Sequence, residues 1–180
     1  MVNQELVRIA GVTTESVVDG PGVRSTIFFQ GCPHACPGCH NPETWRSDGG
    51  KEFSPIELIQ LLDLNPLVTG VTFSGGEPFQ QAPVAAALGN RLRKLGLNIW
   101  VYTGFTWEFL MVNLDRPGYK ELLELAEVLI DGPFIREQRD LSLLFRGSAN
   151  QRLIKVAESL DLGRIVLWQP AGMDVGYGMG

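Results

Sequence analysis

The sequence has no run of Lys or Arg and no stretch that approaches the ~20 apolar residues needed by a membrane-spanning helix. Its formal net charge is −5, which argues against a basic face for nucleic acid. The N-terminal segment also lacks the apolar centre of a signal peptide. We therefore expect a cytoplasmic protein that binds neither nucleic acid nor a membrane.

Charged residues are scarce as well, at 19% of the chain, whereas 44% of the residues are hydrophobic. A disordered chain has the opposite balance, so this composition predicts a packed core. A length of 180 residues fits one domain. We expect a single domain over 1–180, with its core at 14–168 and a flexible, Gly-rich tail at 169–180.

Apolar, β-branched runs alternate with stretches of helical periodicity. The predicted strands cover 25–30, 68–74, 98–103, 127–131, 152–156 and 164–168. The middle strands are apolar at successive positions, which is typical of a parallel sheet with helices on both faces. Three helices are predicted between them, with inward stripes at Ile56, Ile59 and Leu62, at Val84, Leu88, Leu92 and Leu95, and at Tyr119, Leu122, Leu123 and Ala126.

The first helix has the clearest start. Ser54 and Glu57 have the spacing of a capping box, and Pro55 occupies the first helical position. The alternating order of strands and helices implies right-handed crossovers. A closed eightfold barrel takes about 250 residues. We therefore predict an α/β fold of the shortened, open (β/α) partial-barrel type with a mainly parallel sheet.

The chain has only three cysteines, Cys32, Cys36 and Cys39, and all lie within the stretch GCPHACPGCH. Three thiols cannot all pair with one another, and in a reducing compartment such a group favours a soft metal. A zinc ion would need His34 or His40 as a fourth ligand. A four-iron cluster would instead leave one iron open for a small ligand. We favour the cluster, and a zinc-stabilised, non-catalytic binding module is the alternative.

Further candidate residues follow the other strands, at the edge where parallel sheets bind ligands. Gly75 and Gly76 allow backbone to approach a ligand closely, and Glu77 offers a carboxylate to an ammonium group. Thr103 and Asp131 end the next two strands. Three of these residues also have a purely structural explanation. Glu77 could be a solvated residue of a turn, Thr103 could cap a helix, and Asp131 could belong to a turn.

The C-x3-C-x2-C loop and the following Gly-Gly-Glu-Pro loop resemble those of the radical S-adenosylmethionine (SAM) superfamily. The resemblance implies that the cysteines hold a [4Fe-4S] cluster whose open iron binds SAM. Reductive cleavage of SAM then yields methionine and a 5′-deoxyadenosyl radical. The same resemblance implies which residues bind SAM. His40 lies near the adenine and Thr103 at the ribose, while Gly75, Gly76 and Glu77 contact the amino group. Gly38 and Asp131 complete the set. Arg136 is one candidate for the SAM carboxylate.

Four more segments, DGPGVR at 19–24, CHNPETW at 39–45, YTGFT at 102–106 and RGSANQR at 146–152, narrow this resemblance. Over 14–168 the chain is similar to the glycyl-radical activases of anaerobic ribonucleoside-triphosphate reductases. The partners implied are the large subunit of that reductase and an electron donor such as flavodoxin or ferredoxin. An activase of another glycyl-radical enzyme and a small-molecule radical SAM enzyme are alternatives. We expect Arg24 either to face the partner or to brace the sheet.

Overall fold

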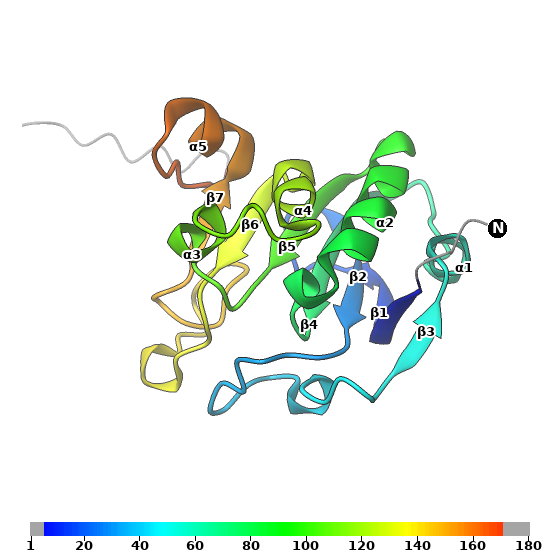
Figure 1. Ribbon diagram of the computed structural model, residues 1–180, viewed down its shortest axis with the longest axis horizontal. Helices are drawn as coiled ribbons and strands as arrows, with labels where there is room; N and C mark the ends of the chain where they lie inside the picture. Colours follow the sequence, from blue (N-terminus) through cyan, green and yellow to red (C-terminus); the bar gives the residue numbers. More distant parts are fainter. Residues whose placement is uncertain (1–5, 171–180) are drawn as a thin grey trace, which may run out of the picture.

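A computed structural model describes residues 6–170, so the predicted tail at 169–180 lies almost entirely outside the described residues. One seven-stranded sheet runs in the order β3-β1-β2-β4-β5-β6-β7 (Figure 1). Within residues 6–170, no helix has the length and apolar character needed to cross a membrane.

The centre of the sheet is parallel, as predicted. Its strands are β2 (Val23–Phe29), β4 (Val68–Gly75), β5 (Asn98–Tyr102) and β6 (Val128–Asp131), each paired with the next. They confirm the four predicted central strands to within two residues at each end. Their carboxyl ends meet at one edge of the sheet, which is where the candidate site residues lie.

Both flanks of the sheet are antiparallel, which the sequence did not predict, although β7 confirms the predicted strand at 152–156 to within one residue. Strands β1 (Val7–Ser16) and β3 (Lys51–Phe53) were not predicted, although β1 forms a long ladder with β2. Strand β7 (Arg152–Lys155) runs antiparallel to β6, because the connection between them holds no crossover helix of the kind a parallel pair requires. The predicted strand at 164–168 amounts to one bridge between Leu167 and Ile154.

The α-helices are α1 (Pro55–Leu61), α2 (Ala82–Lys94), α3 (Trp107–Met111), α4 (Tyr119–Leu125) and α5 (Val156–Leu162). Short 3₁₀ turns lie at η1 (Pro42–Thr44), η2 (Pro78–Gln81) and η3 (Arg136–Gln138). The capping box of Ser54 and Glu57 at the start of α1 is confirmed. Two expected core positions are wrong: Ile56 is 47% exposed, because Leu58 and Leu62 face the core instead, and Leu95 is 58% exposed, because it lies beyond the last turn of α2.

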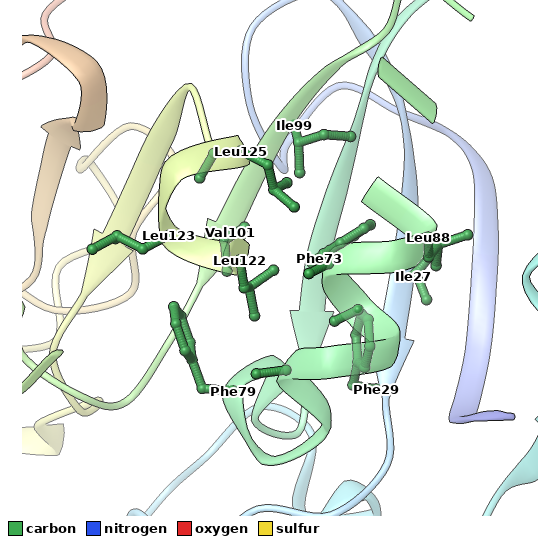
Figure 2. Close-up of a cluster of buried hydrophobic side chains, with 14 of the residues drawn as sticks. Ile27, Phe29, Phe73, Phe79, Leu88, Ile99, Val101, Leu122, Leu123 and Leu125 are labelled. Atoms are coloured by element: carbon green, nitrogen blue, oxygen red, sulfur yellow. The ribbon is translucent and has the colours of Figure 1, made fainter. Parts of the chain in front are cut away.

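The two faces of the sheet are covered differently, which corrects the expectation of helices on both. On one face, which we call the outer face, Leu88 of α2 and Leu122 of α4 pack with Ile27, Phe73 and Val101 of the strands (Figure 2). On the inner face, a smaller cluster forms around Trp100 and receives Phe145 and Trp168 from non-helical segments. No described helix contributes to that cluster. The inner face is therefore open enough to hold a cavity.

Candidate functional site

A cavity of about 410 Å³ lies at the carboxyl ends of β2, β4, β5 and β6. The loops that follow these strands converge on it, as the sequence predicts. The predicted site residues that line it are Cys32, Cys36, Cys39, His40, Gly75, Gly76 and Thr103. Among the described residues, Gly38, Glu77 and Asp131 are predicted site residues that do not line the cavity. The three cysteines therefore share one space with groups from two neighbouring strand ends.

The cysteines are free thiols, each partly exposed. The base of their loop is fixed by the N–H of Cys32, which donates to the carbonyl of Trp45, and Gly38 adopts a left-handed φ of 76° between Cys36 and Cys39. Burial raises the pKa of the Cys32 thiol and that of the Cys36 thiol. A bound soft cation overcomes this preference for the thiol form, because it displaces the protons.

The donor set fits an iron–sulfur cluster better than a single zinc ion. His34, one of the two candidates for a fourth zinc ligand, has its Nε2 hydrogen-bonded to Glu77 at 2.8 Å. Three unpaired thiols spaced around one cavity suit a larger centre, in which each thiolate holds a different iron. In that arrangement neither His34 nor His40 is needed as a ligand.

Gly75 and Gly76 are required by the close approach of β4 to the start of the cysteine loop. A Cβ on Gly75 would lie 2.6 Å from the Cα of Phe28, and one on Gly76 would lie 2.4 Å from the carbonyl oxygen of Gly31. The N–H of Gly76 donates to the carbonyl of Phe29 at 2.8 Å. Backbone, without side chains, therefore forms this wall of the cavity.

Glu77 is fully buried, and its carboxylate is occupied by protein donors. It accepts from His34 Nε2 at 2.8 Å, from the Gly104 N–H at 2.9 Å and from the Phe79 N–H at 3.0 Å. The Thr103 hydroxyl donates to it as well, 2.9 Å from each oxygen. The alternative of a solvated Glu77 is wrong, whereas its predicted contact with an ammonium group stays a prediction. The contact with Glu77 also ties His34, in the cysteine loop, to the end of β4.

Thr103 lines the cavity but does not cap a helix. Its hydroxyl donates to Glu77 and accepts from the Phe105 N–H at 3.1 Å, while Thr106 caps α3. Asp131 is buried behind the cavity wall, where it accepts from the Trp107 N–H at 2.7 Å and from Arg152 Nε at 3.0 Å. Asp131 therefore joins α3 and β7 to the end of β6, and its predicted contact with SAM stays a prediction.

Several residues that line the cavity were not predicted as site residues. They include Asp19, Tyr102, Phe134 and Arg146. The Tyr102 hydroxyl donates to the carbonyl of Phe145 at 2.6 Å, which holds the 133–150 segment against the sheet. Arg146 lines the cavity and its Nη1 donates to the carbonyl of Gln151 at 2.8 Å, whereas the expected Arg136 is exposed and lies against Gly38. The only sequence signal for Asp19 and Arg146 was their place in the DGPGVR and RGSANQR segments.

Arg24 proves to be a brace of the sheet. It is fully buried on the inner face, where its Nε donates to Thr72 Oγ1 at 2.8 Å and its Nη1 donates to Asn98 Oδ1 at 2.7 Å. Its guanidinium also lies over the ring of Trp100, 5.3 Å from the centroid. Burial lowers the pKa of Arg24 to about 10. A residue held in this way is not available to a partner protein.

Comparison with known proteins agrees with this site. Residues 18–154 match the family described as "4Fe-4S single cluster domain". The anaerobic ribonucleoside-triphosphate reductase-activating protein of Escherichia coli K12 is 38% identical over 143 residues, which cover 75% of this chain and 90% of that protein. The protein of the same name from Pasteurella multocida is 33% identical over 150 residues, or 79% of this chain and 93% of that protein.

Two other similarities are more partial. The pyruvate formate-lyase-activating enzyme of Clostridium pasteurianum is 48% identical over 128 residues, which cover 68% of this chain but 50% of that enzyme. The crystal structure of QueE from Escherichia coli matches 56% of this chain and 53% of its own, with 21% identity and a TM-score of 0.45. The chain belongs to the 4Fe-4S single cluster domain family and, within it, to the radical SAM anaerobic ribonucleoside-triphosphate reductase-activating proteins.

Proposed function

We propose that this chain activates an anaerobic ribonucleoside-triphosphate reductase by generating a radical on one of its glycines. The observation that carries the proposal is the set of three free cysteines that share one cavity with the glycines and threonine of two strand ends. When bound, a [4Fe-4S] cluster supplies the electron that cleaves SAM to methionine and a 5′-deoxyadenosyl radical, which takes a hydrogen atom from the glycine Cα.

Different residues of the cavity would bind the [4Fe-4S] cluster and SAM. Cys32, Cys36 and Cys39 would hold the cluster through their thiolates and would leave one iron open for SAM. The backbone of Gly75 and Gly76 borders the amino group of SAM, and the hydroxyl of Thr103 lies on the ribose side. His40 lies on the adenine side, supported by Phe134, whose ring centroid is 5.1 Å away. Gly38 contributes the turn that aims Cys36 and Cys39 at one centre.

Arg146, in place of Arg136, is the guanidinium that we assign to the SAM carboxylate, because it lines the cavity and its buried Nε has no hydrogen-bond partner among the described residues. Glu77 and Asp131 act indirectly. Their carboxylates are fixed by protein donors, so they hold the walls of the cavity in place and leave the amino group of SAM to the backbone.

The substrate glycine is best supplied by another protein, the large subunit of the reductase. The chain covers 90% of its Escherichia coli relative, and the described residues form one sheet with the helices and loops that cover it. Among residues 6–170 there is no second sheet that could form a separate substrate-binding domain. Flavodoxin or ferredoxin is our proposal for the electron donor, since both transfer single electrons at low potential.

A second candidate is activation of a pyruvate formate-lyase. It is favoured by the 48% identity to the Clostridium enzyme, but this chain spans only half of that protein. The reductase remains the better proposal, because its activating proteins match over almost their full length. Offering both enzymes to the same activating protein separates the two possibilities.

The proposal is tested with anaerobically reconstituted protein, SAM and a chemical reductant. We expect iron and sulfide in the ratio of a [4Fe-4S] cluster, release of 5′-deoxyadenosine, and a glycyl radical detected by electron paramagnetic resonance (EPR) when the reductase is present. A colourless protein that contains one zinc ion and does not bind SAM would contradict it. Release of 5′-deoxyadenosine with a radical only on the lyase would support the second candidate.

A further inference from the structure

We infer that His34 and Glu77 act together as a positioning pair that sets the cysteine loop against the SAM-binding wall of the cavity. This inference rests on the proposed function. It concerns neither a ligand of the cluster nor a group that touches the reacting atoms. It assigns a role to a histidine that lies between two of the cluster ligands and to a buried acid that does not line the cavity.

The ring of His34 is held on three sides by the ends of β4 and β5. Its Nε2 lies 2.8 Å from Glu77 Oε2, and the tautomer that carries a proton on Nε2 donates to that oxygen. Its edge meets the ring of Phe105 at a centroid distance of 4.6 Å. Gly104 leaves room for it, because a Cβ there would lie 2.3 Å from His34 Cδ2. The His34 side chain is only 16% exposed, so Glu77, Gly104 and Phe105 enclose it; we call these three residues the cradle.

The cradle itself is rigid. Glu77 is fixed by the N–H groups of Phe79 and Gly104 and by the hydroxyl of Thr103, which leaves its carboxylate no freedom to follow His34. Thr103 and Gly104 also line the cavity. One buried carboxylate therefore contacts both the cysteine loop and the wall that we assign to SAM.

The loop depends on this attachment. Among the hydrogen bonds of the described residues, that of His34 is the one that joins 33–38 to the ends of β4 and β5. The next residue, Ala35, has a φ of 44°, in the left-handed region that costs a residue with a Cβ about 1 kcal/mol. A strained conformation persists when its surroundings fix it, and the anchored ring of His34 does so here.

The expected effect follows from this geometry. Without His34, the cysteines remain and a cluster still assembles, but the Cys32–Cys36 arc loses its fixed position relative to Thr103 and the backbone of Gly75. The cysteine loop and the wall that would bind SAM would then no longer be aligned, and SAM would bind more weakly. Supporting residues around metal sites typically contribute 10–100-fold to affinity or activity, and we expect about 10-fold here.

The test compares His34→Ala, His34→Gln, Glu77→Gln and the double variant His34→Ala with Glu77→Gln. Each reconstituted protein is measured for iron and sulfide, for the dissociation constant of SAM, and for the change in the EPR spectrum of the reduced cluster on SAM addition. Arg46→Gln is the matched control, because it removes an ion pair with Asp48 from the same connection but on the solvent side.

We expect His34→Ala to keep its full cluster content, to bind SAM about 10-fold more weakly and to show a smaller SAM-dependent EPR change. His34→Gln, whose amide can still donate to Glu77, should recover part of the SAM affinity and part of the SAM-dependent EPR change. The double variant should lose no more than the worse single variant, because the two residues act as one unit. Arg46→Gln should match the wild type in all three measurements.

Two results would overturn the inference: wild-type SAM affinity and EPR response in His34→Ala, or loss of the cluster itself in both His34 variants while Arg46→Gln retains it. In either case a wild-type protein that cleaves SAM leaves the proposed function intact. A wild-type protein with a full cluster that neither binds nor cleaves SAM overturns the proposed function, and the inference with it.

Discussion

The two faces of the central sheet are built from alternate residues of the same strands, yet they differ in chemistry. Ile99 and Val101 of β5 point to the outer face and join the large apolar core beneath the helices (Figure 2). Trp100 and Tyr102, the residues next to them, point to the inner face, where loops replace helices. Neighbouring positions on one strand thus serve stability on one side and the cavity on the other.

The inner face is held together by polar contacts more than by apolar burial. Arg24, Thr72 and Asn98 form a buried hydrogen-bonded group there, and Asp19 accepts from the hydroxyls of Ser16 and Thr26. Such contacts fix directions as well as distances, which a cofactor site needs. The comparison predicts that substitutions on the outer face lower stability, whereas those at the cavity lower activity without unfolding the protein.

Cys36→Ala should have the largest effect, the loss of SAM cleavage to background. The substitution leaves the outer core untouched and removes one of the three cysteine ligands, and the chain has no other cysteine to replace it. Production of 5′-deoxyadenosine by the reconstituted variant is the measurement, with Arg46→Gln as the control. Full SAM cleavage by Cys36→Ala would show that the cavity does not hold the cluster in the way proposed.

Phe73→Ala should lower the free energy of unfolding by about 3–5 kcal/mol, because it opens a hole in the outer core where Phe73 is fully buried. Denaturant unfolding measures this loss. Val112→Ala, at a residue that is mostly exposed, should change stability by less than about 0.5 kcal/mol. The folded fraction of Phe73→Ala should still bind SAM, and a variant that is stable but cannot bind SAM would break the division between the two faces.

Arg24→Met should cost about 2–3 kcal/mol of stability although it keeps the length of the side chain. The cause is the loss of hydrogen bonds, since Val71 O, Thr72 Oγ1 and Asn98 Oδ1 each lose a donor on the inner face. Denaturant unfolding again gives the value. An unchanged or increased stability would mean that the inner face is held by apolar packing, as the outer face is.

The smallest predicted effect is the pH dependence of one surface pair. Hydrogen bonds from Arg152 lower the pKa of Glu108 to about 2, from a model-compound value of 4.5. The folded-state value is depressed, so the stability from this pair is present above pH 4.5 and is lost as the pH falls towards 2. Because the Glu108 side chain is 62% exposed, solvent screening limits the contribution to below about 1 kcal/mol. Glu108→Gln should reduce the slope of stability against pH in this range, and an unchanged slope would exclude the pair as its source.

The central fold was predictable because its strands carry strong local signals. Apolar, β-branched runs end in glycine at each of the four parallel strands, and Ser54 and Glu57 mark the first helix start without tertiary information. Strand β1 was missed because GVTTE, at 11–15 in its C-terminal half, is mainly polar and partly or fully exposed. Such a strand is defined by pairing with β2, which only the folded chain provides.

The site was predictable by residue type but not by contact. The cysteines, Gly75, Gly76 and Thr103 do line one cavity, since their loops follow neighbouring parallel strands. The partners of Glu77 and Asp131 were not predictable. Apart from the Phe79 N–H, the donors to these two carboxylates lie 21 or more positions away in the sequence, as His34 and Arg152 do, so local sequence patterns could not reveal them.

The central claim is that a radical formed in this cavity takes a hydrogen atom from a glycine of the reductase. The most direct test uses reductase whose glycines carry deuterium at Cα, mixed anaerobically with the reconstituted protein, SAM and reductant. The account predicts that deuterium appears in 5′-deoxyadenosine together with a glycyl radical on the reductase. Formation of 5′-deoxyadenosine without deuterium, while the reductase remains free of radical, would contradict it.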